Sequence, residues 1–166
     1  MESILPALMA VTIMLLASLT IGRSSLTSFE VLGDAWQDAE ERSVELVRSD
    51  ITITAITAVG PNVDVTVRND GATRVVDFSR MDVVVQYTGA GTSFIKYLPF
   101  TIETTPQPAD TWRVISITND VIDPNVLNTG ESLNIRMRLT PAPDSGSHWV
   151  QVTTELGISA SLFFTN

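Results

Sequence analysis

The first part of the chain is apolar without interruption, and this pattern predicts a long helix. From Ser3 to Gly22 no side chain carries a charge. The large apolar residues between Leu5 and Ile21 go all the way round a 3.6-residue helical wheel instead of forming one stripe. About 20 such residues are enough to cross a bilayer as a helix. We therefore expect this helix to lie in lipid or in the middle of a helical bundle.

After Gly22 the pattern becomes amphipathic, which predicts that the helix continues to about Arg48. Apolar residues recur at steps of three and four, so they share one face of a helix. Acidic residues occupy the other side. Gly33 weakens the helix by about 1 kcal/mol relative to alanine and is a candidate bend. The apolar positions of this face are Leu26, Phe29, Leu32, Trp36 and Ala39.

From Asp50 onward the hydrophobic period changes to two, which is typical of half-buried β-strands. Turn-forming residues such as Asn69-Asp70-Gly71 separate the short alternating segments. Many short strands at this spacing predict an immunoglobulin-like antiparallel β-sandwich. The Pro-rich segment 102–111 is expected to be an exposed loop. The strands are expected at Ile51–Val59, Val63–Arg68, Arg74–Phe78, Asp82–Thr88, Ser93–Leu98, Trp112–Thr118, Ser132–Leu139, Trp149–Thr154 and Ser159–Phe164.

The predicted fold class is thus α+β, with a long hydrophobic N-terminal helix (residues 1–48) followed by a β-sandwich (residues 49–166). The chain has 166 residues and a formal charge of −9, and 44% of the residues are hydrophobic, which leaves enough apolar material for a real core. Acidic residues are spread along the whole chain, and no basic block is present, which argues against nucleic-acid binding. Lys96 is the only lysine. The absence of cysteine excludes disulfides, zinc–cysteine sites and thiol catalysis.

No pattern in the sequence supports an enzyme or a cofactor site. The single histidine, His148, lies beside a Ser-Gly-Ser turn and is interpreted as an exposed turn residue, since no catalytic motif accompanies it. Four aspartates near turns offer oxygen ligands for calcium, but the Asp-x-Asp-x-Asp-Gly loop is missing, so scattered surface acids are the favoured interpretation. These are Asp64, Asp70, Asp77 and Asp82. The three tryptophans are interpreted as core or interface residues.

The apolar helix, its amphipathic continuation and a cysteine-free sandwich together resemble the archaellin family, the filament subunits of the archaeal swimming organelle. Two β patterns carry the resemblance besides Ile4–Ile21: VDVTVRNDGATRVVDFSRMDVVVQY (Val63–Tyr87) and WRVISITNDVIDPNVLNTGESLNIRMRL (Trp112–Leu139). Pilins of the related type IV class usually have glutamate at the fifth mature position, where this chain has Leu5. The acid is Glu2 instead, which fits archaellins better.

The resemblance implies a subunit of an extracellular archaellum-type helical filament, inserted in the membrane through Ile4–Ile21 before assembly. It also implies a prepilin-type peptidase that removes a short basic leader and an ATP-driven assembly platform as partners. The start Met1-Glu2-Ser3 lacks the positive charge of a secretory signal, so a removed leader and an uncleaved anchor both remain open. The residues expected to form the filament-core interface are Ile4, Leu5, Leu8, Met9, Val11, Ile13, Leu15, Leu16, Leu19, Ile21, Leu26, Phe29, Leu32 and Trp36.

Two other functions fit the same sequence. One is a membrane-anchored accessory protein resembling the archaellum stator proteins, whose sandwich binds the surface layer of the cell envelope. The Val63–Tyr87 pattern fits these proteins about as well as it fits filament subunits. The other is an anchored enzyme or solute-binding domain, which would need a concave polar site that periodicity does not reveal.

Overall fold

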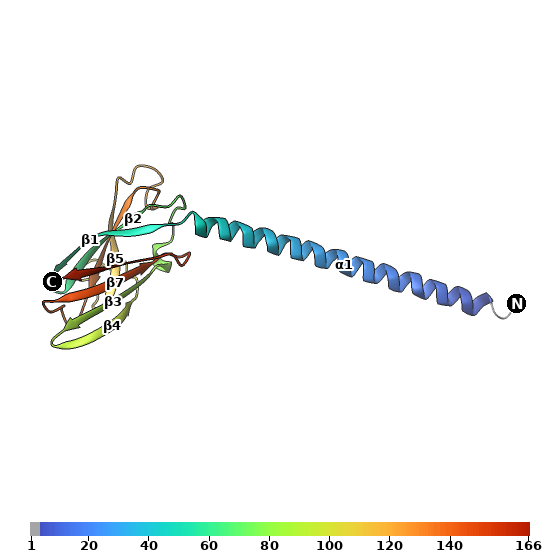
Figure 1. Ribbon diagram of the computed structural model, residues 1–166, viewed down its shortest axis with the longest axis horizontal. Helices are drawn as coiled ribbons and strands as arrows, with labels where there is room; N and C mark the ends of the chain where they lie inside the picture. The colour runs from blue at the N-terminus through green and yellow to red at the C-terminus, as the bar shows by residue number, and fades with distance from the viewer. Residues whose placement is uncertain (1–3) are drawn as a thin grey trace. The chain divides into compact units, whose positions relative to one another are not determined.

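The computed structural model describes the backbone of residues 4–166 and the side chains of residues 8–20 and 31–166. One α-helix, α1, extends over Ile4–Val47 without interruption (Figure 1). The hydrogen-bonded helix passes through Gly33, where a Cβ atom would meet nothing within 4 Å. Contacts divide the chain into two compact units, one up to Val44 and one from Glu45 to Asn166.

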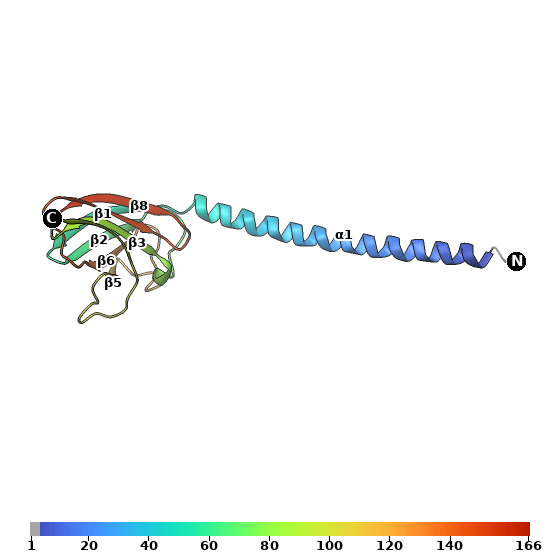
Figure 2. The same ribbon diagram turned by 90° about the horizontal axis from the view of Figure 1, so that it is seen from below.

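The second unit is a β-sandwich of two four-stranded sheets, in which every pair of neighbouring strands is antiparallel (Figure 2). One sheet has the strand order β1-β2-β6-β5 and the other has the order β4-β3-β7-β8. The expected α+β class is therefore confirmed. The strands are β1 (Ile51–Val59), β2 (Asn62–Asn69), β3 (Asp82–Gly89), β4 (Thr92–Leu98), β5 (Thr111–Thr118), β6 (Ser132–Arg138), β7 (Ser147–Thr153) and β8 (Ser159–Thr165).

The core lies between the sheets and is built from alternate residues of the central strands. Because successive side chains of a strand point to opposite faces, every second residue of β2, β3, β6 and β7 is buried. The alternation of the sequence thus gives the inward register correctly. The fully buried side chains include Val63, Val65, Val67, Val83, Val85, Leu133, Ile135, Met137, Val150 and Val152. Trp112 of β5 is also fully buried and meets the ring of Phe100 edge-on, with centroids 4.9 Å apart.

The predicted strand at Arg74–Phe78 is wrong. Only Val75 makes a β-bridge there, to Leu127, and a short 3₁₀ helix, η1, follows over Phe78–Arg80. The neighbouring residues find side-chain partners instead of a strand: the Val76 N–H bonds Glu155 Oε1, and the Asp77 carboxylate accepts from the Ser79 N–H at 3.0 Å. A carboxylate that bonds its own backbone two residues on favours a turn over a ladder.

The loop before β5 is exposed over most of its length, as expected, except at Gln107. This side chain is only 6% exposed. Its Nε2 donates to the backbone oxygens of Thr111 at 3.0 Å and Arg136 at 3.1 Å, which ties the loop to β5 and β6. The buried amide therefore fixes one point of an otherwise solvated loop.

Candidate assembly surface

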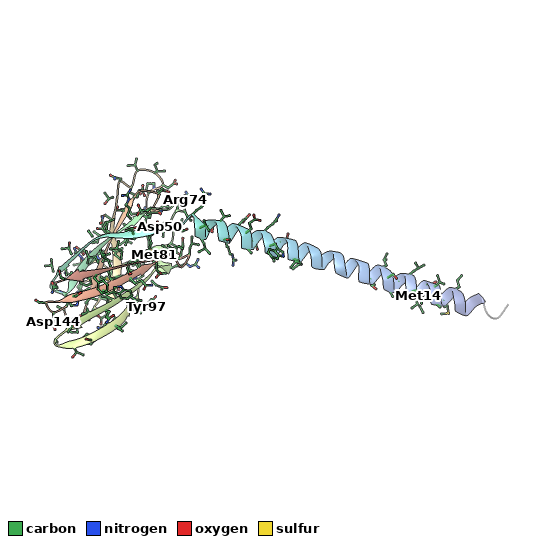
Figure 3. All side chains as sticks on the ribbon, viewed as in Figure 1. Met14, Asp50, Arg74, Met81, Tyr97 and Asp144 are labelled. Carbon is green, nitrogen blue, oxygen red and sulfur yellow. The ribbon has the colours of Figure 1, made fainter. Side chains whose placement is uncertain are left out.

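The apolar part of α1 presents large side chains on all sides. Between residues 8 and 19, eight large apolar side chains are 57–73% exposed. They are Leu8, Met9, Val11, Ile13, Met14, Leu15, Leu16 and Leu19. Figure 3 shows Met14 projecting from this part of the helix. At about 1.5–3 kcal/mol for each large aliphatic side chain, burying this set is worth about 12–24 kcal/mol.

Both threonine hydroxyls of this segment form hydrogen bonds within the helix itself. Thr12 Oγ1 donates to the Leu8 carbonyl at 2.8 Å, and Thr20 Oγ1 donates to the Ala17 carbonyl at 2.8 Å. A hydroxyl that donates to a carbonyl of its own helix needs no hydrogen-bond acceptor outside the helix. The surface of residues 8–20 is therefore mainly apolar, and its threonine hydroxyls already have acceptors within the helix.

The second half of the helix has a different character. All side chains from Val31 to Val47 are exposed. Leu32 and Trp36, which lie one turn apart, belong to the predicted apolar face, and Trp36 is 70% exposed. Asp34, Asp38 and the following acids occupy other positions of the same helix. This part therefore combines one apolar face with a strongly acidic one.

The structure describes nine side chains of the predicted filament-core interface, and each of them is exposed: Leu8, Met9, Val11, Ile13, Leu15, Leu16, Leu19, Leu32 and Trp36. The side chains of Ile4, Leu5, Ile21, Leu26 and Phe29 lie outside the described set. Whether these residues meet another copy of the chain remains a prediction. Over the described residues, no helix meets the combined length and hydropathy expected of a membrane span.

The turn after β2 holds the chain where it leaves α1 and enters β1. The N–H groups of Asp70 and Gly71 both donate to the Asp50 carbonyl at 3.0 Å, and the Ala72 N–H donates to the Arg48 carbonyl at 2.7 Å. The buried side chain of Asn69 shapes this turn, because its Oδ1 accepts from the Gly71 N–H. The space at Gly71 is closed: a Cβ atom there would lie 2.3 Å from the Asp50 nitrogen. A side chain at residue 71 is therefore incompatible with this geometry.

The interpretation of His148 as an exposed turn residue is wrong. This histidine faces inward from β7 and is only 3% exposed. It shares the inward register with Val150 and Val152. Its ring is held by backbone groups: Nδ1 accepts from the Thr88 N–H, and Nε2 lies 2.8 Å from the Asp144 carbonyl. These bonds fit a neutral ring with its proton on Nε2. The Ser-Gly-Ser sequence correctly indicated a turn. The strand was expected to begin at Trp149, however, whereas β7 begins at Ser147 and includes His148.

Three of the four aspartates considered as possible calcium ligands have other roles. Asp64 forms a two-point ion pair with Arg136, at 2.6 and 2.7 Å. Asp70 pairs with Arg68 at 3.0 Å, and Asp77 caps η1. Among the residues with described side chains, no three histidine or carboxylate groups come together as a metal site.

Lys96 is enclosed in a way that the sequence did not indicate. Its Nζ donates to Asp110 Oδ2 at 2.7 Å and to the Thr140 carbonyl, and lies over the rings of Phe94 and Tyr87. Burial alone would lower the pKa of Lys96, but the interactions with Asp110 and Tyr87 outweigh it and hold the pKa above its ordinary value. Burial also raises the pKa of Tyr87. The cluster joins β4 to the loops before β5 and after β6.

The outward face of the β4-β3-β7-β8 sheet carries exposed apolar side chains. Ile95 lies opposite Gln86, which lies opposite Trp149, which in turn lies opposite Phe163. Ile95 and Phe163 at the ends of this row are strongly exposed, as is Tyr97 on β4. No periodicity in the sequence distinguishes these positions from inward ones, because β4 and β8 are apolar on both faces.

Comparisons with known proteins agree with this architecture. The family model for archaeal-type flagellin matches residues 14–164. An uncharacterized protein of Archaeoglobus fulgidus is 26% identical over 132 residues, which span 78% of this chain and 75% of that protein.

Three solved structures share the fold. FlaB1, an archaeal flagellin from Methanocaldococcus jannaschii, aligns with a TM-score of 0.51 at 14% identity over 71% of this chain and 90% of its own. The archaellum periplasmic stator protein FlaG from Sulfolobus acidocaldarius aligns with a TM-score of 0.50 at 21% identity, over 70% of this chain and 99% of its own. The FlaF and FlaG stator complex of that organism gives a TM-score of 0.52 at 20% identity, over 69% and 87%.

Proposed function

The chain belongs to the archaeal-type flagellin family, and from this premise we propose that it is the structural subunit of an archaellum-type motility filament. In this proposal α1 lies in the core of a helical polymer and the β-sandwich forms the outer layer. The domain division proposed from the sequence, with residues 1–48 in the core and 49–166 outside, follows the same plan. The filament is extracellular, at the cell surface.

One observation carries the proposal: the eight large apolar side chains of residues 8–19 are exposed around the whole helix. Water is a costly environment for such a surface, by about 12–24 kcal/mol. Other copies of the same helix provide an equally apolar environment, in which the rods pack by dispersion. Contacts that join two different faces of identical subunits extend into a helical filament when the rotation between subunits does not close a ring.

Before assembly the same apolar segment needs another apolar environment, and we propose that the membrane supplies it. Exchange of lipid for neighbouring helices changes the free energy little, because lipid tails are as apolar as leucine. The transfer thus avoids water at every stage. A peptidase that prepares the N-terminus and an ATPase platform that moves the subunit complete the proposal, and both rest on the archaellin resemblance alone.

The test is electron microscopy of filaments sheared from cells that produce the chain with Leu15→Asp. A carboxylate in the packed helical core is left without a partner, so we expect no filaments. Gln37→Asp is the matched control. It adds the same charge to the same helix, on the side of Asp34 and Glu41, and should leave the filaments intact. Filaments of normal abundance with Leu15→Asp would contradict the proposal.

The alternative is an anchored, stator-like protein whose sandwich binds the envelope surface layer. The fold does not separate the two functions, because the TM-scores for FlaB1 and FlaG are nearly the same, 0.51 and 0.50. The abundance of the chain in each cell fraction distinguishes the two functions. A filament subunit dominates the protein sheared from cells, whereas a stator-like protein stays with the envelope in few copies. Recovery of the wild-type chain only from the envelope fraction would favour the alternative.

A further inference from the structure

The outward face of the β1-β2-β6-β5 sheet contains a cleft of about 220 Å³ in which three arginines converge. The loop before β5 forms one wall. The lining residues are Pro61, Asn62, Thr104, Gln107, Arg113, Arg136 and Arg138. None of the lining residues is acidic, although the chain as a whole has a formal charge of −9.

The register of the strands forces the guanidinium groups together. Arg136 of β6 lies directly opposite Arg113 of β5 on one side and Asp64 of β2 on the other. Arg138 lies two residues further along β6 and therefore on the same face. Like charges directly opposite each other on neighbouring strands are destabilising. Among the residues with described side chains, Asp64 pairs with Arg136 alone, so the cluster retains the charge of two arginines.

Gln107 positions the other two arginines. Its side-chain Oε1 accepts from Arg113 Nε at 3.1 Å, and its backbone oxygen accepts from Arg138 Nη1. Because Gln107 is itself buried and bonded to β5 and β6, these two guanidinium groups are held in place and not left to move in solvent. In the bonds formed among the described residues, each arginine keeps N–H donors for a further acceptor.

We infer that this cleft binds a single oxyanion group: a carboxylate, a sulfate or a phosphate. The planar guanidinium group matches the geometry of these anions and bonds them with two parallel N–H groups. An anion beside Arg113 and Arg138 also offsets the positive charge that Asp64 leaves uncompensated. The formal charge of −9 on the chain disfavours the binding of long polyanions, so the site is expected to take one charged group and not a nucleic-acid backbone.

The test is equilibrium dialysis of radiolabelled sulfate against the full-length chain in a neutral detergent, at constant ionic strength set with chloride. We expect saturable binding of one sulfate per chain. Arg113→Gln and Arg138→Gln should each weaken it about tenfold or more, which corresponds to about 1.4 kcal/mol. Arg74→Gln is the control, because Arg74 is exposed and pairs with Asp123 away from the cleft. It should bind sulfate like the wild type.

Absence of saturable binding would overturn the inference, and so would an equal loss of affinity in Arg74→Gln. Two substitutions in the cleft keep the test valid if one of them prevents folding, which circular dichroism reveals. Dialysis against the assembled or envelope-bound chain identifies the source of the anion. Unchanged sulfate binding there indicates a free ion, and blocked binding indicates an acidic group of a neighbouring molecule. Both results support an oxyanion site, and neither depends on whether the chain polymerises.

Discussion

Gly71→Ala should destabilise the β-sandwich by about 2–4 kcal/mol. The new Cβ atom would lie 2.3 Å from the Asp50 nitrogen and 2.6 Å from the Arg48 carbonyl oxygen. Both atoms belong to the backbone, so the turn itself must move. This movement breaks the three close hydrogen bonds from Asp70, Gly71 and Ala72 to the segment that follows α1. Each such bond contributes about 0.5–1.5 kcal/mol.

The assay is guanidinium-induced unfolding of the full-length chain in detergent, followed by tryptophan fluorescence. Trp112 is fully buried in the sandwich, so its emission reports the unfolding of this unit. Gly33→Ala is the matched control, since a Cβ atom at Gly33 meets nothing within 4 Å and lies in the helix. The control should leave the unfolding midpoint of the sandwich unchanged. A Gly71→Ala protein that unfolds within about 0.5 kcal/mol of the wild type would refute the reasoning, because surface substitutions commonly stay within that range.

Three further predictions follow from the described contacts. Trp112→Ala removes a fully buried ring and its edge-on contact with Phe100, and should cost about 3–5 kcal/mol. Because this variant lacks the fluorescent reporter, its guanidinium unfolding is followed by circular dichroism and compared with that of the wild type. The raised pKa of Lys96 means that the folded state holds its proton more tightly, so this stabilisation is complete below about pH 10.5 and is lost as the pH rises through the folded pKa. Unfolding measured from pH 9 to 12 should show a shallower loss for Lys96→Met than for the wild type, and an equal loss would contradict the role of the cluster. Trp36→Ala removes a side chain that is 70% exposed, so it should leave the unfolding of the chain in detergent unchanged but reduce the filaments recovered from cells. Normal filament yield would remove Trp36 from the proposed interface.

The spacing of hydrophobic residues and the turn-forming residues were sufficient to predict the helix and eight of the strands, because both signals are local in the sequence. α1 required only an unbroken apolar and then amphipathic run, and strands such as Val63–Arg68 alternate in the sequence as they do in space. Arg74–Phe78 shows the limit of this reasoning. Its apolar residues resemble a strand, but the pairing is limited to the single bridge between Val75 and Leu127, and the Asp77 carboxylate accepts from the Ser79 N–H instead.

The side-chain clusters were harder to predict because they depend on register between distant strands. Arg113 and Arg136 are 23 positions apart in the sequence, and only the pairing of β5 with β6 places them opposite each other. Gln107 looks like an ordinary loop residue, yet it is buried and joins two arginines. His148 was misplaced for the same reason: its burial follows from the register of β7, which a turn signal does not reveal. The apolar surface of α1 could be predicted from the sequence, because it follows from local helical periodicity and does not depend on the pairing of distant strands.

The enclosure of Lys96 has a practical consequence for fluorescent labelling of this protein. It is the only side-chain amine of the chain, and an aspartate and two aromatic rings surround it. Succinimidyl-ester dyes should therefore decorate the sandwich poorly, and forcing the reaction would disrupt the cluster. The chain has no thiol, so a cysteine introduced at the exposed residue Thr92 would give a single attachment point for maleimide fluorophores. Light microscopy of living cells could then follow the labelled molecules without background from the rest of the polypeptide.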